Sequence, residues 1–199
     1  IFNYTVASGH TSSDLAYTST SALVLNSGTI KDLVGNPSTL TLPAVGQTNS
    51  LSANKDLIID TTVPTVTNVT STSNDGSYKI GDVIPVTVTF SEVVNVVTTG
   101  GTPQLTLETG SNDAVVNYTT GTGTNTLTFN YTVVEGHTST DLNYVATSSL
   151  ALNSGTIKDA ATNDATLTLP AIDNASSLAG NKALVIDGVT PTITSVTST

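Results

Sequence analysis

Cysteine is absent from the 199-residue sequence, and this absence removes several kinds of site from consideration. Disulfide bonds, thiolate metal ligands and cysteine nucleophiles all require it. Tryptophan, methionine and arginine are absent as well, and the aromatic residues are limited to six Tyr and three Phe. Glycan-binding platforms usually offer exposed aromatic rings to sugar faces, so a carbohydrate- or cell-binding module is a disfavoured alternative for this chain.

Positive charge is also scarce, because five Lys face 15 acidic residues and the formal net charge is −10. Neutralising a row of phosphates or binding an anionic membrane surface needs basic clusters. No apolar run approaches the roughly 18 residues of a membrane-spanning helix. We therefore expect no nucleic-acid partner and no membrane span in this segment.

Motifs of the common catalytic machineries are missing too. The sequence has no G-x-S-x-G, no H-E-x-x-H and no phosphate-binding glycine-rich loop. Its two histidines, His10 and His137, occupy matching GHTS stretches, which indicates a structural role in a loop. We predict that the protein is not an enzyme.

Threonine and serine dominate what is present, with 40 Thr and 22 Ser. β-Branched residues fit a pleated, half-buried surface, so this composition is typical of solvated β-sheet. The first ten residues resemble the middle of a strand, and they lack the features of a signal peptide. We therefore expect the sequence to be an internal piece of a longer protein.

The octapeptide LNSGTIKD occurs twice, at residues 25–32 and 152–159. A shift of 127 positions aligns residues 1–72 with residues 128–199 without a gap, and 44 of the 72 pairs are identical. Self-similarity at a fixed period is the signature of a repeat architecture. The chain therefore contains about one and a half copies of a 127-residue unit.

The linker, residues 59–66 (IDTTVPTV), recurs as IDGVTPTI at residues 186–193. Proline tends to occupy the first residue of a strand, so Pro64 and Pro191 are predicted to open new domains. The predicted divisions are the C-terminal part of one repeat (1–60), a complete repeat (61–187), and the linker with the first strand of the next repeat (188–199).

Period-two alternation predicts strands throughout the repeat, above all in VIPVTVTF and TLTFNYTV. The predicted inward residues of these two segments are Ile84, Val86, Val88, Phe90, Leu127, Phe129, Tyr131 and Val133. TPQLTLET, AVVNYTT, TLTLP and KALVID are predicted to be shorter strands, and no segment has a helical period. Seven or more short antiparallel strands per repeat indicate an all-β sandwich.

Three segments carry a resemblance to a known family: GSYKIGDVIPVTVTFSEVV, GTIKD…GN and LVID…TP. They resemble the immunoglobulin-like tandem repeats of giant bacterial surface adhesins. The flagellar-system-associated repeats of a cyanobacterial swimming protein and the extender domains of large calcium-dependent adhesins are of this type. The resemblance implies tandem immunoglobulin-like antiparallel β-sandwiches. One departure is Thr162, which stands where the first copy has Gly35.

Oxygen ligands converge at one predicted pole of the complete repeat. In a sandwich with its termini at opposite poles, Asp60 of the linker lies at the top, and Glu92 follows an upward strand to the same pole. A late loop carries Asp159 and Asn163 there as well, and Asp187 repeats the position of Asp60 at the other end. Because Ca²⁺ prefers carboxylate and carbonyl oxygens, these five residues are the predicted metal ligands, with Ca²⁺ stiffening the joints.

Two functions follow from this organisation. The first is a structural extender or shaft of an extracellular bacterial surface fibre or adhesin, whose partners are neighbouring repeats of the same chain or copies of itself. The second is a self-assembling filament, in which a neighbouring molecule donates strands to an incomplete repeat. Both place the protein outside the cell, on the cell surface.

Overall fold

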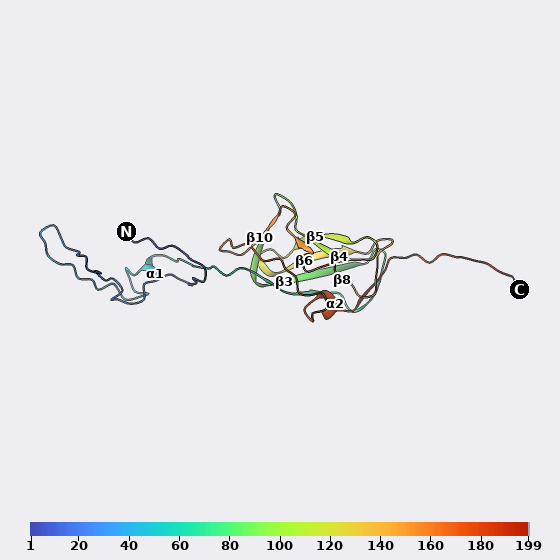
Figure 1. Cartoon of the computed structure of the whole chain (residues 1–199), viewed down its shortest axis with the longest axis horizontal. Helices are drawn as coiled ribbons and strands as arrows, with labels where there is room; N and C mark the ends of the chain where they lie inside the picture. Colours follow the sequence, from blue (N-terminus) through green and yellow to red (C-terminus); the bar gives the residue numbers. More distant parts are fainter. Residues whose placement is uncertain (199) are drawn as a thin grey trace. The chain divides into compact units, whose positions relative to one another are not determined.

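The computed structural model describes residues 1–198 (Figure 1). It divides the chain into two compact units, the first spanning Ile1–Thr62 and the second beginning at Val63. This division falls two residues after the domain boundary predicted at residue 60. No helix in the described part of the chain is long and apolar enough to cross a membrane.

The second unit is built from short strands, as the composition predicts. Its strands are β1 (Val66–Ser71), β2 (Gly76–Lys79), β3 (Val83–Val97), β4 (Gln104–Glu108), β5 (Ala114–Thr120), β6 (Thr124–Thr132), β7 (Thr138–Ser139), β8 (Asn143–Tyr144), β9 (Leu150–Ala151), β10 (Thr156–Lys158) and β11 (Leu184–Asp187). A single-turn helix, α2 (Leu178–Asn181), precedes β11. The prediction of an all-β fold is confirmed.

These strands form two sheets. The larger one follows the order β1-β3-β6-β5-β4-β8, with β10 paired to β3 and β9 paired to β4, and the smaller one has the order β2-β11-β7. Among the named strands every pair is antiparallel except β2 and β11, which run parallel from Gly76–Lys79 against Leu184–Asp187. The antiparallel prediction is wrong at this pair, because alternation along a sequence defines the two faces of a strand and not the direction of its partner.

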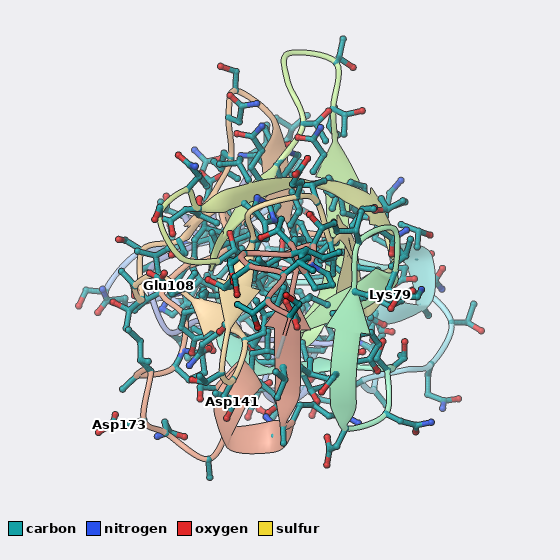
Figure 2. All side chains as sticks on the ribbon, turned by 90° about the vertical axis from the view of Figure 1, so that its right-hand side faces the viewer. Lys79, Glu108, Asp141 and Asp173 are labelled. Atoms are coloured by element: carbon teal, nitrogen blue, oxygen red, sulfur yellow. The ribbon has the colours of Figure 1, made fainter. Side chains whose placement is uncertain are left out.

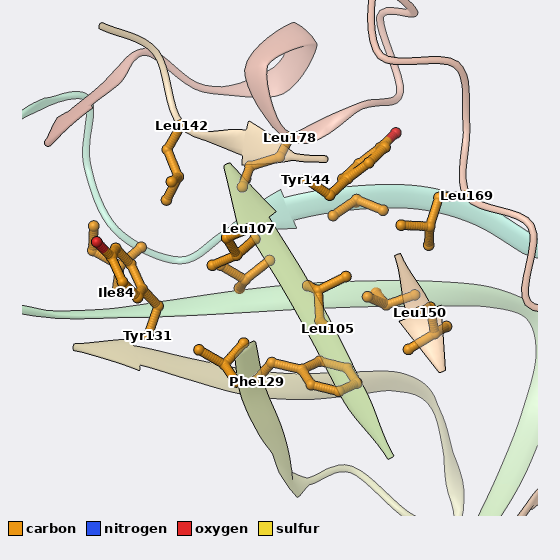
Figure 3. Close-up of a cluster of buried hydrophobic side chains, with 14 of the residues drawn as sticks. Ile84, Leu105, Leu107, Phe129, Tyr131, Leu142, Tyr144, Leu150, Leu169 and Leu178 are labelled. Carbon is orange, nitrogen blue, oxygen red and sulfur yellow. The ribbon is translucent and has the colours of Figure 1, made fainter. Parts of the chain in front are cut away.

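The core contains the residues that the period-two alternation predicts to face inward. All eight of the predicted inward residues of β3, β6 and the residue after β6 are buried, from Ile84 to Val133. Figure 3 shows Ile84, Phe129 and Tyr131 facing a second group of apolar side chains that includes Leu105 and Leu107 of β4. Apolar faces of several strands therefore enclose one core, and the unit has the character of a β-sandwich.

One local prediction is wrong, and two short helices occur that the sequence pattern does not indicate. TLTLP, residues 166–170, forms no strand: Thr166 makes an isolated bridge to Thr65, and Leu169 is buried without a ladder. Helices also occur, α1 (Leu51–Asn54) in the first unit and α2 in the second, each capped by a serine side chain. A helix of four residues is too short to show a 3.6-residue period, so only its cap is visible in a sequence.

The first unit contains no strand among its described residues. Its regular structure is α1, together with isolated bridges that join Ser12 to Ile59 and Lys31 to Pro37. Turn hydrogen bonds close its loops, as from the Gly28 amide to the Leu25 carbonyl at 2.7 Å. Many of its large apolar side chains are exposed, among them Ile1, Phe2 and Leu33.

Candidate cation site

The candidate site begins at an interruption in the ladder along β3. Strand β1 pairs with β3 up to Phe90, and β10 pairs with the same strand from Asn95 onward. Glu92 lies in this interruption and is half-buried. Its backbone position is fixed from both directions, because β3 continues in strand conformation from Val83 through Val97.

A loop after β10 brings a second carboxylate to the same place. Asp159 directly follows Lys158, which is paired with Asn95 of β3, and Asp159 as a whole residue is only 4% exposed. Both carboxylate oxygens accept hydrogen bonds from Asn163: its amide nitrogen donates to Oδ1 at 2.8 Å, and Nδ2 donates to Oδ2 at 2.7 Å. The loop therefore holds Asp159 in one orientation.

The start of the second unit is tied to β3 beside Glu92. The Thr65 amide donates to Ser91 Oγ at 3.0 Å, and the Ser91 amide donates to the Thr65 carbonyl at 2.8 Å. The Thr166 amide also donates to the carbonyl of Pro64, which is buried. These bonds fix the chain at Pro64, four residues after Asp60, so the third predicted ligand is carried into this region by the linker itself.

Asp60, Glu92 and Asp159 form an acidic cluster able to hold a metal ion. Each offers one carboxylate oxygen, and these oxygens all lie within 4.8 Å of one another. Two oxygens that bind one Ca²⁺ at about 2.4 Å are at most about 4.8 Å apart, so the spacing fits a shared ion. Carboxylates are hard donors that suit Ca²⁺, Mg²⁺ or Mn²⁺ and not soft metals.

The electrostatics of the cluster favour a cation. Two unit charges 4.8 Å apart repel by about 3 kcal/mol at an effective dielectric constant of about 20. The nearest Lys in sequence, Lys158, is bound to Asp164, with Nζ and Oδ1 2.8 Å apart. A divalent ion bound to all three carboxylates would replace this mutual repulsion by attraction.

The remaining two predicted ligands differ in their placement. Asn163 lies beside the cluster, where its amide groups orient Asp159. Asp187 ends β11, pairs with Lys79 and Thr138, and accepts a hydrogen bond from the Val189 amide at 3.1 Å. It is not part of the acidic cluster, which among the described residues consists of Asp60, Glu92 and Asp159.

Other acidic residues of the second unit serve loops and strand ends. Figure 2 labels Lys79, Glu108, Asp141 and Asp173, which lie at such positions. Asp141 accepts from the Leu184 amide at 3.3 Å, and Glu108 accepts from the Gly110 amide at 3.1 Å. Lys79 pairs with Asp82, whose pKa is lowered chiefly by the Lys79 backbone amide and then by the Lys79 side chain. Within the described residues only one group of three or more acidic or histidine side chains has ligand spacing.

The histidines are placed as their loops predict. His137 Nδ1 lies 3.0 Å from the hydroxyl of Tyr131, and the two rings stack with centroids 5.8 Å apart. His10 and Tyr4 repeat this contact in the first unit, at 2.7 Å and 5.7 Å. Each histidine therefore packs against a tyrosine and holds it in place. The signal in the sequence is the spacing of six residues between Tyr and His, which is the same in both copies.

The backbone bonds that hold Thr65 against Ser91, and Pro64 against Thr166, are the part of the site that the sequence analysis missed. The available signal is Pro64, which the sequence predicts to open a strand and whose carbonyl binds the Thr166 amide. Comparison with known proteins gives no further constraint, because no family model, no curated protein and no solved structure matches the chain.

Proposed function

We propose that this chain is a structural extender, part of the shaft of an extracellular bacterial surface fibre or adhesin. Its units are tandem immunoglobulin-like repeats, and Ca²⁺ bound by Asp60, Glu92 and Asp159 stiffens the linker. In this function each repeat contributes length, and adhesion to a target resides elsewhere in the fibre.

The observation that carries the proposal is the origin of the three carboxylates. Asp60 comes from the linker, Glu92 from β3 and Asp159 from the loop after β10, yet their oxygens share a region small enough for one ion. An ion bound by all three removes the freedom of the linker, because the residues between Asp60 and Pro64 are then held at both ends. The repeat of linker and loop in the sequence supports the same arrangement at successive joints.

Calcium is the metal of choice for two reasons. Its flexible coordination by six to eight oxygens accepts an irregular set of carboxylates and waters, whereas Mg²⁺ requires a near-ideal octahedron. Extracellular modules also bind Ca²⁺ with dissociation constants of about 10⁻⁴–10⁻³ M, an affinity that two half-buried carboxylates and one buried carboxylate can supply.

The proposal is tested by thermal unfolding and small-angle X-ray scattering of the full chain, in Ca²⁺ and in chelator. Ligand bound only to the folded state stabilises it by about 2.7 kcal/mol when its concentration is 100 times the dissociation constant. We expect chelation to lower the unfolding midpoint of the second unit and to broaden the distance distribution of the particle. Equal midpoints and equal distance distributions in the two conditions would contradict the proposal.

Glu92→Gln is the test variant for this experiment, and Asp32→Asn is its control. Asp32 occupies the position of Asp159 in the first copy and makes the same bonds, with Asn36 Nδ2 2.8 Å from its Oδ2. It lies outside the acidic cluster. Glu92→Gln should abolish the difference between Ca²⁺ and chelator, and Asp32→Asn should preserve it.

A further inference from the structure

We propose that strands β2 and β11 form a mechanical clamp, a pair of strands that resists forces pulling the two ends of the second unit apart. The inference deepens the proposed function, on which it rests, because the shaft of a fibre carries tension along its length. Its structural basis is the parallel pairing of Gly76–Lys79 with Leu184–Asp187. None of these residues belongs to the acidic cluster.

The chain enters and leaves the second unit at opposite ends of the first half of β3. At the entry, Val66 of β1 pairs with Phe90. At the exit, Asp187 pairs with Lys79, which a tight turn connects to the start of β3 at Val83. A strand advances about 3.3 Å per residue, so the step from Val83 to Phe90 separates the two ends by about 23 Å.

Tension between these ends acts along the strands of the clamp. Strand β1 runs from the entry toward the exit, and tension carried through it pulls β2 from its first residue, Gly76. The same tension pulls β11 from its last residue, Asp187. Because β2 and β11 run parallel, these pulls slide the strands past each other lengthwise, and all the hydrogen bonds between them carry the load together. A pull across the strands would break the same bonds one at a time.

Further hydrogen bonds extend the clamp beyond the paired residues. The Gly76 amide donates to the Ala183 carbonyl at 3.0 Å, and the Ala183 amide donates to Asp75 Oδ1 at 3.1 Å. Lys182 Nζ donates to the Ser73 carbonyl at 2.8 Å. All three bonds join the segment that leads into β2 to the segment that leads into β11, so they share the lengthwise load.

Strand β11 is in turn held by the rest of the second unit. Leu184 is fully buried and Ile186 is 3% exposed, so one face of the strand packs on the core. On the side away from β2, the Leu142 amide donates to the Leu184 carbonyl at 2.8 Å, and the Gly188 amide donates to the His137 carbonyl at 2.8 Å. Strand β2, in contrast, has β11 as its one partner among the named strands. Load that reaches β2 therefore passes to β11.

The test applies a constant force to the full chain with optical tweezers, in chelator so that bound Ca²⁺ plays no part. The sequence contains no Cys, so two introduced cysteines define the points of attachment. Thr72→Cys with Val189→Cys loads β2 and β11 lengthwise, and Ile80→Cys with Val189→Cys pulls apart their adjacent ends. All three residues are exposed. We expect the folded lifetime to be at least about 100-fold longer in the lengthwise geometry, because several bonds then break together. Equal lifetimes would overturn the inference.

Three variants, measured in the lengthwise geometry, distinguish the clamp from general stability. Asp75→Ala removes the acceptor of the Ala183 amide and should shorten the lifetime about tenfold. Asp75→Asn keeps an acceptor oxygen and should preserve the lifetime. Val116→Ala, in the core on β5, should lower the urea midpoint and leave the lifetime unchanged, since contacts still formed at rupture do not affect the unfolding rate. Equal shortening by Asp75→Ala and Val116→Ala would show that no clamp limits forced unfolding.

Failure of the clamp and failure of the proposed function give different results. Without a clamp, the two pulling geometries give equal lifetimes, and the effect of chelation on the distance distribution of the particle remains. Without Ca²⁺ at the linker, chelation leaves that distribution unchanged, and the ratio of the two lifetimes remains.

Discussion

The two copies of the repeat differ in burial while agreeing in local geometry. The hydroxyl of Tyr17 donates to the carbonyl of Pro43, and its counterpart Tyr144 donates to Pro170 in the same way. Short-range structure, set by side chains within about 30 residues, is therefore encoded within residues 1–62 alone.

The burial of matching side chains, unlike their local hydrogen bonds, differs between the two copies. Leu57 is 39% exposed and its counterpart Leu184 is 0% exposed, although both sit in the same short motif. The neighbouring hydrogen bond is present in both copies, from the Leu15 amide to Leu57 and from the Leu142 amide to Leu184, each at 2.8 Å. The difference is the parallel pairing of β11 with β2, which the first unit lacks. Turns and caps form locally, and a core requires the strands that come from residues 63–127.

The largest expected difference between the copies is in their phenylalanines. Phe129→Ala should lower the free energy of unfolding of the second unit by about 3–5 kcal/mol, because it leaves a cavity in a closed core. Phe2→Ala should change it by less than about 0.5 kcal/mol. Urea unfolding followed by circular dichroism measures both, and equal losses would remove the distinction between an open and a closed copy.

A smaller effect is expected at the helix cap. Ser177 is fully buried, accepts from the Gly180 amide at 3.0 Å and donates to the Ile172 carbonyl at 2.8 Å. Ser177→Ala should therefore cost about 1–2 kcal/mol of unfolding free energy in the second unit. Ser50→Ala, the matching change at α1, should leave the second unit at its original stability. The same urea titration tests the pair, and a loss below 0.5 kcal/mol for Ser177→Ala would contradict the account of this cap.

One substitution should raise the free energy of unfolding of the second unit by about 1 kcal/mol. Thr162 adopts a φ of 73°, and its counterpart Gly35 adopts 97°. A β-branched residue in this region is strained by about 1–3 kcal/mol, so Thr162→Gly should stabilise the second unit even after the entropy that glycine gains on unfolding. Gly35→Thr is the reciprocal change, with a destabilising effect confined to the first unit. A lower melting temperature for Thr162→Gly would show that the loop depends on its threonine.

The smallest effect near neutral pH is that of the buried tyrosines, because it begins only in alkali. Burial raises the pKa of Tyr131 and of Tyr144 from 10.0 to about 12. Between these values the folded state holds protons that the unfolded state has released, so stability is intact below pH 10 and falls as pH rises toward 12. Urea midpoints measured from pH 9 to 12 should decline, and Tyr131→Phe should reduce the decline. A flat profile would contradict the burial of the two hydroxyl groups.

The sequence predicted the part of the fold that depends on period and composition. Alternation identified the inward residues of β3 and β6, because one face of each strand packs on the core. It missed the parallel pairing of β2 with β11, the absence of a strand at residues 166–170, and the single-turn helices. Each of these features depends on a partner strand or on a helix cap. The spacing of apolar residues along the sequence carries no information on partner strands or caps.

The candidate site was predictable to a similar extent. Asp60, Glu92 and Asp159 were assigned to one pole from the order of strands, and the structure brings their oxygens together. Asp187 was assigned on repeat position alone and lies outside the cluster, since a repeated residue makes a site only where its partners are repeated as well. Asn163, also a predicted ligand, lies beside the cluster and donates two hydrogen bonds to Asp159.

Calcium titration of the full chain by isothermal calorimetry tests the central claim most directly, with Asp60→Asn and Asp187→Asn compared side by side. The two aspartates share a repeat position and a turn, since Asp60 accepts from the Thr62 amide at 2.9 Å and Asp187 from the Val189 amide at 3.1 Å. If the linker cluster binds Ca²⁺, the original chain and Asp187→Asn bind one ion, and Asp60→Asn loses at least about tenfold in affinity, or about 1.4 kcal/mol. Equal affinities for the two variants, or no heat from the original chain, would contradict the claim.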